Sequence, residues 1–177
     1  MTARLSQIDA FFVAYQLATG ILMQHGVEAE LGAVFTQADL DGPLRRLLAR
    51  WPQLGMTVKA GAFGLSPGRA CAVEEICHRG TDPSQIPAWR NRPINPFTEP
   101  PFQVLWIPQE RSTILACRTH HCVADAEAMS AVCLDAMRSL AVIGGGGVIA
   151  PGEPTPSVTL SDLMPWKKVR QNRRWWS

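Results

Sequence analysis

Two adjacent histidines and a nearby aspartate form the part of the sequence best suited to chemistry. His120 and His121 end an apolar run, and Asp125 follows four residues after the second histidine. Neighbouring side chains on an extended backbone point to opposite sides, so only one ring can face a given cavity. A helix that begins at Asp125 would bring its positive N-terminal end close and disfavour imidazolium. A neutral imidazole here suits a general base that works near pH 7.

Asp125 is expected to organise this turn and not to act as a nucleophile. At the start of a helix its carboxylate can accept hydrogen bonds from free backbone N–H groups or pair with an arginine. Three alternatives remain open. The segment could be a satisfied polar turn without function, a metal site of His121 and Asp125 with Cys117 or Cys122 nearby, or a nucleophilic pair of Cys122 and His121. We expect no metal ion, because adjacent histidines rarely bind one ion together, and an inert, packed Cys122.

Hydrophobic periodicity indicates the elements that must position these residues. Apolar residues at helical spacing predict helices over residues 5–17, 40–51 and 125–140. Alternating or wholly apolar runs predict strands over residues 24–35, 55–59, 65–76, 102–107 and 113–119. The proline-dense segment between residues 83 and 101 is expected to be a loop. This order predicts an α/β fold, a two-layer sandwich with a mixed sheet.

Three of these elements have a predicted inward face. The first helix is expected to bury a stripe formed by Leu5, Ile8, Phe12, Tyr15 and Ala18. One side of the strand over residues 24–35 is formed by His25, Val27, Ala29, Leu31, Ala33 and Phe35. The helix that follows the histidines has an apolar face formed by Met129, Val132, Cys133, Ala136, Met137 and Leu140.

Composition predicts one folded domain followed by a tail. The chain has 177 residues, of which 46% are hydrophobic and 18% are charged, and this is enough apolar material for one core. The 5 cysteines include no CxxC pair, so we expect free thiols in a reducing, cytoplasmic setting. The apolar stretch at residues 10–15 is too short for a membrane span and follows an aspartate, so neither a span nor a signal peptide is expected.

A basic tail follows a segment rich in glycine and proline. We expect a body over residues 1–141, a flexible linker over residues 142–160 and the tail over residues 161–177. Between Trp166 and Trp176 the tail combines lysines and arginines with tryptophans. That composition suits a membrane surface, and we do not expect a nucleic-acid partner. The interpretation that we favour is a solvated terminus or a crossover to a further half-domain.

The strand, the HHCVAD sequence and the helix that follows resemble the condensation domains of peptide synthetases. They also resemble wax ester synthase and diacylglycerol acyltransferase enzymes and their chloramphenicol-acetyltransferase-like relatives. Residues 5–12 (LSQIDAFF) look like the opening of the wax ester synthase type, and residues 92–97 (RPINPF) and 101–104 (PFQV) look like the lead-in to the strand before the motif. The resemblance covers most of residues 5–140 and implies one half of a chloramphenicol-acetyltransferase-like fold.

This resemblance implies acyl transfer from an acyl-CoA or carrier-bound thioester to a hydroxyl or an amine. The second histidine of the HHxxxD motif, here His121, is the base in that family, and the aspartate, here Asp125, is mainly structural. The candidate catalytic residues are therefore His121, Asp125 and His120. No covalently bound cofactor is implied. The glycine that usually follows the aspartate is Ala126 here.

Enzymes of this family are built from two similar halves, with the catalytic tunnel between them and a DFGWG-like segment in the second half. This sequence contains no such segment. We therefore expect a second half-domain or a homo-oligomer partner to complete the site, because an uncovered half would expose an apolar face. The rival functions are a non-catalytic homologue that acts as a binding or assembly subunit, and a membrane-surface protein that uses the basic tail.

Overall fold

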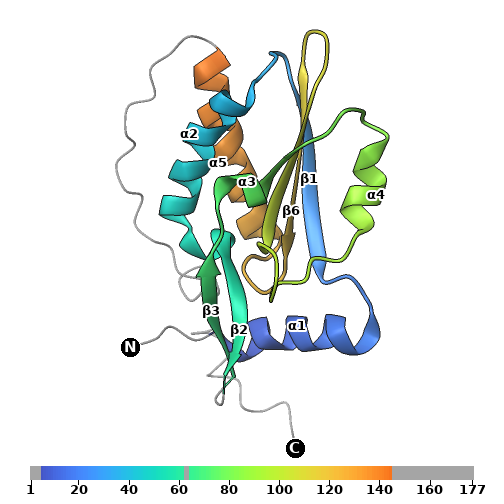
Figure 1. Ribbon diagram of the computed structural model, residues 1–177, viewed down its shortest axis with the longest axis vertical. Coiled ribbons are helices and arrows are strands. Elements are labelled where there is room, and N and C mark those ends of the chain that lie inside the picture. Colours follow the sequence, from blue (N-terminus) through green and yellow to red (C-terminus); the bar gives the residue numbers. More distant parts are fainter. Residues whose placement is uncertain (1–4, 62–63, 145–177) are drawn as a thin grey trace, which may run out of the picture.

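The computed structural model describes residues 5–61 and 64–144 and arranges them as helices packed on a mixed sheet (Figure 1). The strand order of this sheet is β1-β6-β5-β4. Strand β6 (Thr113–His120) lies between β1 (Gln24–Leu31) and β5 (Phe102–Pro108) and is antiparallel to both. Strand β4 (Cys77–Arg79) runs parallel to β5. The predicted α/β fold with a mixed sheet is confirmed.

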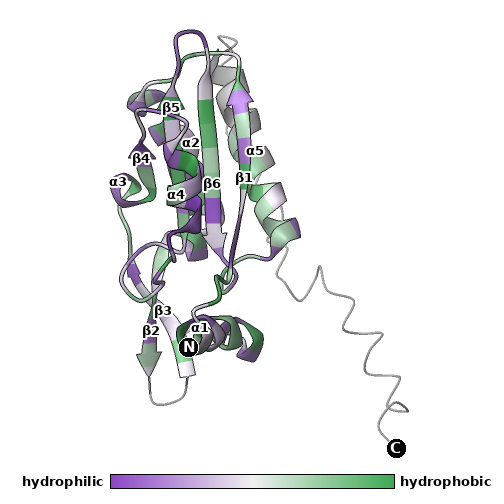
Figure 2. Cartoon of the chain, turned by 90° about the vertical axis from the view of Figure 1, so that its right-hand side faces the viewer, coloured by the Kyte–Doolittle hydropathy of each residue, from purple (hydrophilic) through white to green (hydrophobic). Residues whose placement is uncertain are grey.

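Helices cover both faces of the sheet, which explains why its central strands are buried. Helices α2 (Gln37–Arg50) and α5 (Ala126–Gly144) pack on one face, and α4 (Gln85–Asn91) packs on the other (Figures 1 and 2). Strand β5 is buried at every position except its last, and β6 at every position except its second. Strands with both faces covered are mostly apolar, and the middle of each of these two strands is, whereas Gln103, Arg118, Thr119 and His120 are buried polar residues near the strand ends.

The largest core cluster lies between α2, α5 and the sheet. Helix α2 begins with a capping box, in which Thr36 and Asp39 each bind the other's backbone N–H group through their side chains. The buried positions of α2 include Leu40, Leu44 and Leu47, which follow helical spacing in the predicted helix over residues 40–51. The buried positions of α5 include Met129, Val132, Cys133 and Ala136, again at the predicted spacing.

Helix α1 (Gln7–Thr19) lies across one end of the sheet and buries the predicted stripe only in part (Figure 1). Its buried residues are Val13 and Gln16, whereas Ile8 from the predicted stripe is exposed. The Gln16 amide donates to the Ile94 carbonyl at 2.8 Å and accepts from the Met23 N–H at 2.9 Å. The helix is thus fixed partly by polar contacts, which hydrophobic periodicity does not encode.

The segment after α2 differs in part from the prediction. A short turn, η1 (Pro52–Gly55), leads to a two-stranded antiparallel sheet of β2 (Met56–Gly61) and β3 (Gly64–Ala70). The strand predicted over residues 65–76 ends at Ala70 and is followed by helix α3 (Val73–Ile76). This helix forms because the Glu75 carboxylate accepts from the Ala72 N–H at 2.9 Å, and it is also ion-paired with Arg69.

The proline-dense segment predicted as a loop contains helix α4. Pro87 is the third residue of this helix, in the first turn, where backbone N–H groups have no acceptor within the helix. Its missing N–H therefore costs little there. Ile86 packs against Leu105, Ile107 and Ala116 of the sheet, and this burial explains why a helix forms.

Helix α5 ends at Gly144, inside the range predicted as linker, and the rest of the linker and the tail lie outside the described residues. No helix in the described part of the chain is long and apolar enough to cross a membrane. All five cysteines lie in the described part and carry free thiols.

Candidate active site

The turn that follows β6 is held by the segments on both sides of it. The N–H of His120 donates to the Pro101 carbonyl, and the N–H of His121 donates to the Met23 carbonyl, each over 2.8 Å. Pro101 precedes β5 and Met23 precedes β1, so the two neighbouring strands fix the end of β6. The HHxxxD segment therefore leaves the sheet at a defined position.

His120 is fully buried and holds the turn. Its Nδ1 accepts a hydrogen bond from the Cys122 N–H at 3.1 Å. An accepting Nδ1 leaves the proton of a neutral ring on Nε2, and Nε2 is buried without a hydrogen-bond partner among the described residues. Burial lowers the pKa of His120 to about 4, with a smaller contribution from His121. This imidazole is therefore neutral at pH 7.

His121 occupies a different environment, as the alternation of side chains on an extended backbone predicts. Its ring is stacked on Phe12 of α1, with 4.7 Å between centroids and 26° between planes. The ring of His25 meets it at 61°, with 4.6 Å between centroids. Burial lowers the pKa of His121, and the Asp125 carboxylate partly opposes this shift. His121 is only half-buried, so its ring is neutral near pH 7 and a substrate can still reach it.

Asp125 contacts the start of α5 and the imidazole of His25. Its Oδ1 accepts from the Ala128 N–H at 2.8 Å, and this is the N-cap hydrogen bond that the sequence predicts. Its main-chain oxygen accepts from the Met129 N–H at 2.9 Å and lies 2.9 Å from Nε2 of His25. Within the described residues the Asp125 carboxylate forms no ion pair with an arginine. Its contacts are those of an organiser.

Two residues that contact His121, Phe12 and His25, are not among the predicted site residues. His25 was assigned to the apolar side of a strand, and Phe12 to an apolar helical stripe, and both reach the same ring. His25 is paired with Thr119 in the β1–β6 ladder, and directly paired residues point to the same face. His121 follows Thr119 by two residues and so lies on that face as well, which explains its contact with His25. A histidine among apolar residues on the inward side of a strand was the signal that could have identified His25.

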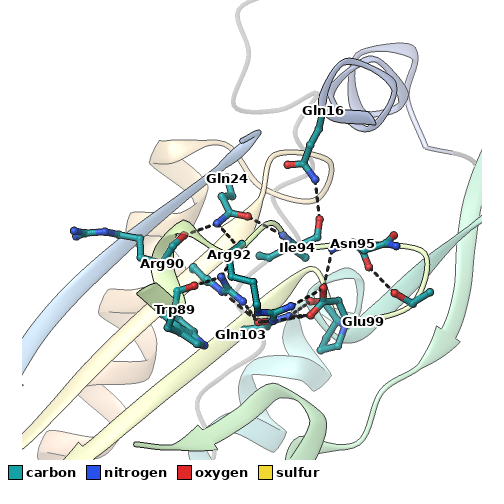
Figure 3. Close-up of polar contacts among 12 residues, drawn as sticks. Gln16, Gln24, Trp89, Arg90, Arg92, Ile94, Asn95, Glu99 and Gln103 are labelled. Atoms are coloured by element: carbon teal, nitrogen blue, oxygen red, sulfur yellow. Dashed lines mark hydrogen bonds and ion pairs between the residues drawn. The ribbon is translucent and has the colours of Figure 1, made fainter. Parts of the chain in front are cut away.

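A polar network fastens the segment before β5 to the strands that carry the site (Figure 3). Arg118 is 1% exposed. It donates to the carbonyl oxygens of Trp89 and Arg92, and to Oε1 of Gln103 at 2.6 Å. Arg92 pairs with Glu99 at 2.8 Å, and Gln103 donates to the same carboxylate at 2.9 Å. Burial lowers the pKa of Arg118 to about 10, so it remains cationic at pH 7.

Two glutamines extend this network to α1 and β1 (Figure 3). Gln24, which is paired with His120 across the sheet, accepts from the Ile94 N–H at 2.9 Å and donates to the Arg92 carbonyl at 3.0 Å. Gln16 donates to the Ile94 carbonyl. The RPINPF stretch, which the resemblance singled out, therefore joins α1, β1 and β6 near the histidines.

Two of the alternative chemistries lack support in the geometry. Burial raises the pKa of Cys122 to about 12, so its thiol is not ionised near pH 7 and makes a poor nucleophile. Cys122 instead contributes its N–H to His120. In the described part of the chain, no three side chains of His, Cys, Asp or Glu lie close enough to hold one metal ion.

Comparison with known proteins finds similarity in structure only. No protein-family model and no curated protein matches this sequence. The starter condensation domain of rhizomide synthetase RzmA superposes with a TM-score of 0.71 and 15% identity, over 97% of this chain and 44% of that one. The X-domain of teicoplanin biosynthesis, solved in complex with OxyB, superposes with a TM-score of 0.71 and 17% identity, over 95% of this chain and 38% of that one.

The chain therefore has the fold of one half of a condensation domain, as the resemblance implied. It spans less than half the length of the solved chains that it matches. A variant of the RzmA starter domain has been solved in complex with C8-CoA, and it superposes with a TM-score of 0.70 and 14% identity, over 86% of this chain and 38% of that one.

Proposed function

We propose that this protein is a condensation-type acyltransferase that moves an acyl group from a CoA or carrier thioester to a hydroxyl or an amine. The environment of His121 is the observation that carries the proposal. Its half-buried imidazole lies against Phe12 at the end of β6, and burial lowers its pKa, so the ring is neutral near pH 7 and able to take a proton. The condensation-domain fold and the complex of the RzmA variant with C8-CoA support a thioester donor.

In the proposed reaction His121 is the general base and acts through Nε2. Its Nδ1 is buried, which leaves Nε2 to approach a substrate. Nε2 removes the proton of the acceptor O–H or N–H while that oxygen or nitrogen attacks the thioester carbonyl carbon. The C–S bond then breaks, and the thiolate takes the proton back from His121. The products are an ester or amide and a free thiol, and the imidazole returns to its neutral form.

His120 and Asp125 support the base in this proposal and do not touch the substrate. His120 is fully buried and bonded to the Cys122 N–H, so its contribution is the shape of the turn. Asp125 fixes the start of α5 through the Ala128 N–H. The carboxylate also lies close enough to His121 to favour its imidazolium form during the reaction.

We also propose that a partner covers the outer face of α1 and completes the site. Ile8, Phe11 and Leu17 of this helix are 47%, 54% and 64% exposed, which is unusual for three large apolar side chains on one short helix. The chain spans less than half of the condensation domains that it matches. A second half-domain or a second copy of this chain fits both observations.

A non-catalytic binding or assembly subunit is the second candidate. The complex of the X-domain with OxyB favours it, because there a protein of this fold is seen bound to another protein. The hydrogen bonds of His120 and Asp125 stabilise the turn without any substrate, so the motif could serve structure alone. The two candidates differ in whether His121 is needed.

The deciding experiment assays acyl transfer by the full chain, co-purified from its own host with any partner, using a series of acyl-CoA donors with alcohol and amine acceptors. We expect His121→Ala to lower the rate by about 100-fold or more. His78→Ala is the matched control, because His78 is also half-buried but lies on β4, at the far edge of the sheet from β1. Equal rates for the native protein and both variants, or no transfer by a preparation that retains its partner, would assign the binding role.

A further inference from the structure

Two neighbouring imidazoles each bury a nitrogen that has no hydrogen-bond partner. Within the described residues, Nδ1 of His25 and Nδ1 of His121 are both buried and unpaired, and the two rings are 4.6 Å apart between centroids. An unpaired buried polar atom costs about 1–3 kcal/mol, so most buried polar atoms are paired. Two such atoms on adjacent rings indicate a hydrogen bond that forms when one ring rotates towards the other.

The proton position on His25 follows from its other contact. Nε2 of His25 lies 2.9 Å from the main-chain oxygen of Asp125. A carbonyl oxygen only accepts hydrogen bonds, so Nε2 of His25 carries a hydrogen and donates it. Burial and the neighbouring His121 lower the pKa of His25, which keeps the ring neutral. Its buried Nδ1 therefore presents a lone pair, which is a hydrogen-bond acceptor without a donor.

If His121 acts as a base, its ring has a hydrogen-bond donor that lacks an acceptor. A neutral imidazole that takes a proton at Nε2 carries its hydrogen on Nδ1 beforehand. That hydrogen is a buried donor without an acceptor. The neighbouring ring offers the acceptor, and the edge-on arrangement of the two rings, at 61°, lets a rotation of either ring turn one nitrogen towards the other.

We propose that His25 is a positioning residue for His121 and accepts a hydrogen bond from its Nδ1–H group, both in the neutral ring and after His121 has taken up a proton at Nε2. The Asp125 carbonyl fixes the orientation of His25, so Asp125, His25 and His121 act in series. The titratable groups that face His121 are His25 from β1, His120 beside it in the chain and the Asp125 carboxylate before α5. A bond from a charged donor is stronger than a neutral one, so the pair stabilises the single proton that His121 takes up.

The role of His25 rests on the proposed function in one respect only, which is that the acceptor substrate supplies the proton that His121 takes up. The tautomer of His121 is independent of any activity. With His25 in place, the hydrogen of neutral His121 belongs on Nδ1, which directs the Nε2 lone pair outwards. A ring with its hydrogen on Nε2 would leave lone pairs on both facing nitrogens and could not serve as a base towards substrate.

The test uses the full chain with ¹⁵N-labelled histidine and long-range ¹H–¹⁵N spectra, which distinguish the two tautomers. At neutral pH we expect the hydrogen of His121 on Nδ1 and that of His25 on Nε2. A native protein with the hydrogen of His121 on Nε2 overturns the proposal, and this measurement needs no variant to fold.

Three substitutions then separate the two nitrogens of His25. His25→Phe keeps a ring and removes both nitrogens, His25→Asn places an amide near the position of Nδ1, and His25→Gln places one near the position of Nε2. We expect His25→Phe and His25→Gln to weaken the tautomer preference of His121 and lower kcat by about 10-fold with little change in KM, and His25→Asn to restore both. Equal behaviour of the Asn and Gln variants, or an unchanged tautomer in His25→Phe, overturns the proposal. The expected tautomers without any acyl transfer would instead overturn the proposed function.

Discussion

The ring of Phe12 is stacked on the imidazole of His121, with 4.7 Å between the two centroids. Phe12 belongs to α1, at the beginning of the chain, and His121 follows the last strand of the sheet. The phenyl ring removes water from one face of the imidazole and so contributes to the burial that lowers the pKa of His121. Helix α1 therefore has a direct influence on the candidate base.

The first prediction concerns this aromatic contact. Phe12→Ala rehydrates the imidazole, and because hydration favours the charged form, the pKa of His121 should rise towards that of a free histidine. Phe11→Ala is the control, since Phe11 is 54% exposed on the same helix. Titration of ¹⁵N-labelled histidine by NMR measures both variants. A similar rise in both would assign the shift to a general loosening of α1.

Acid should destabilise the protein through His120. Its pKa is lowered from 6.5 to about 4 in the folded state. Between these two values the unfolded chain binds a proton that the folded chain does not, so the free energy of unfolding decreases as the pH falls from 6.5 to about 4. The loss for this group is about 3 kcal/mol, and the lowered pKa values of His25 and His121 act in the same direction.

Urea unfolding at pH 7 and pH 4.5 measures this loss. His120→Asn keeps a hydrogen-bond acceptor for the Cys122 N–H and does not titrate, so it should lose clearly less stability between the two pH values than the native protein. The same loss in both proteins would exclude His120 as the source of the acid sensitivity.

Asp125 is predicted to stabilise α5 through its hydrogen bond and not through its charge. Asp125→Ala removes the acceptor of the Ala128 N–H and should cost about 1 kcal/mol of unfolding free energy. Asp125→Asn keeps a good N-cap and should cost only a few tenths of that amount. Thermal and urea unfolding of the two variants provide the comparison. An Asn variant as unstable as the Ala variant would show that the carboxylate charge matters.

The close approach of β1 to β6 requires a glycine at position 26. A Cβ added to Gly26 would lie 2.5 Å from the main-chain oxygen of Cys117, which is too close for any real contact. Gly26→Ala should therefore force the strands apart and cost about 1–3 kcal/mol. Gly32→Ala is the control, because a Cβ there meets no atom within 4 Å. Urea unfolding of both variants tests the pairing, and equal stabilities would contradict it.

Arg118 should contribute strongly to stability despite its charge. Arg118→Met fills a similar volume but removes the charged donor that binds the carbonyl oxygens of Trp89 and Arg92 and the amide oxygen of Gln103. The expected cost is about 3 kcal/mol, because three acceptors lose a charged partner, although Gln24 still donates to the Arg92 carbonyl and Arg92 to Gln103. Arg111→Met, at an exposed position between β5 and β6, should change stability by less than about 0.5 kcal/mol. Similar effects of the two substitutions on urea unfolding would argue against the network.

The elements predicted best from the sequence are those that form because of a local pattern. Helices α2 and α5 and strands β5 and β6 are present, with the expected apolar faces, because periodicity and capping residues determine them locally. The fold of half a condensation domain followed from the HHxxxD resemblance. Helix α4 was missed because it forms through the burial of Ile86 against the sheet, which overrides a proline-rich sequence.

The candidate site was predicted only in part, because most of its contacts are non-local. The motif itself and the N-cap at Asp125 were visible in one short stretch of sequence. The contacts of Phe12 and His25 with His121 depend on where α1 lies and on the β1–β6 register, and neither is encoded by spacing. Arg118 was missed because an arginine is normally exposed, and only the assembled fold gives it buried acceptors.

The contact between His25 and Asp125 joins residues that are 100 positions apart in the chain. Strand β1 is made first and its partner β6 last, so during synthesis β1 has no neighbour in the sheet for about 5–20 s at ordinary translation rates. Pairings of such long sequence separation also slow folding in vitro. Recovery of the site should therefore lag behind helix formation on refolding, and no nascent fragment that stops before Asp125 can hold His25 in place.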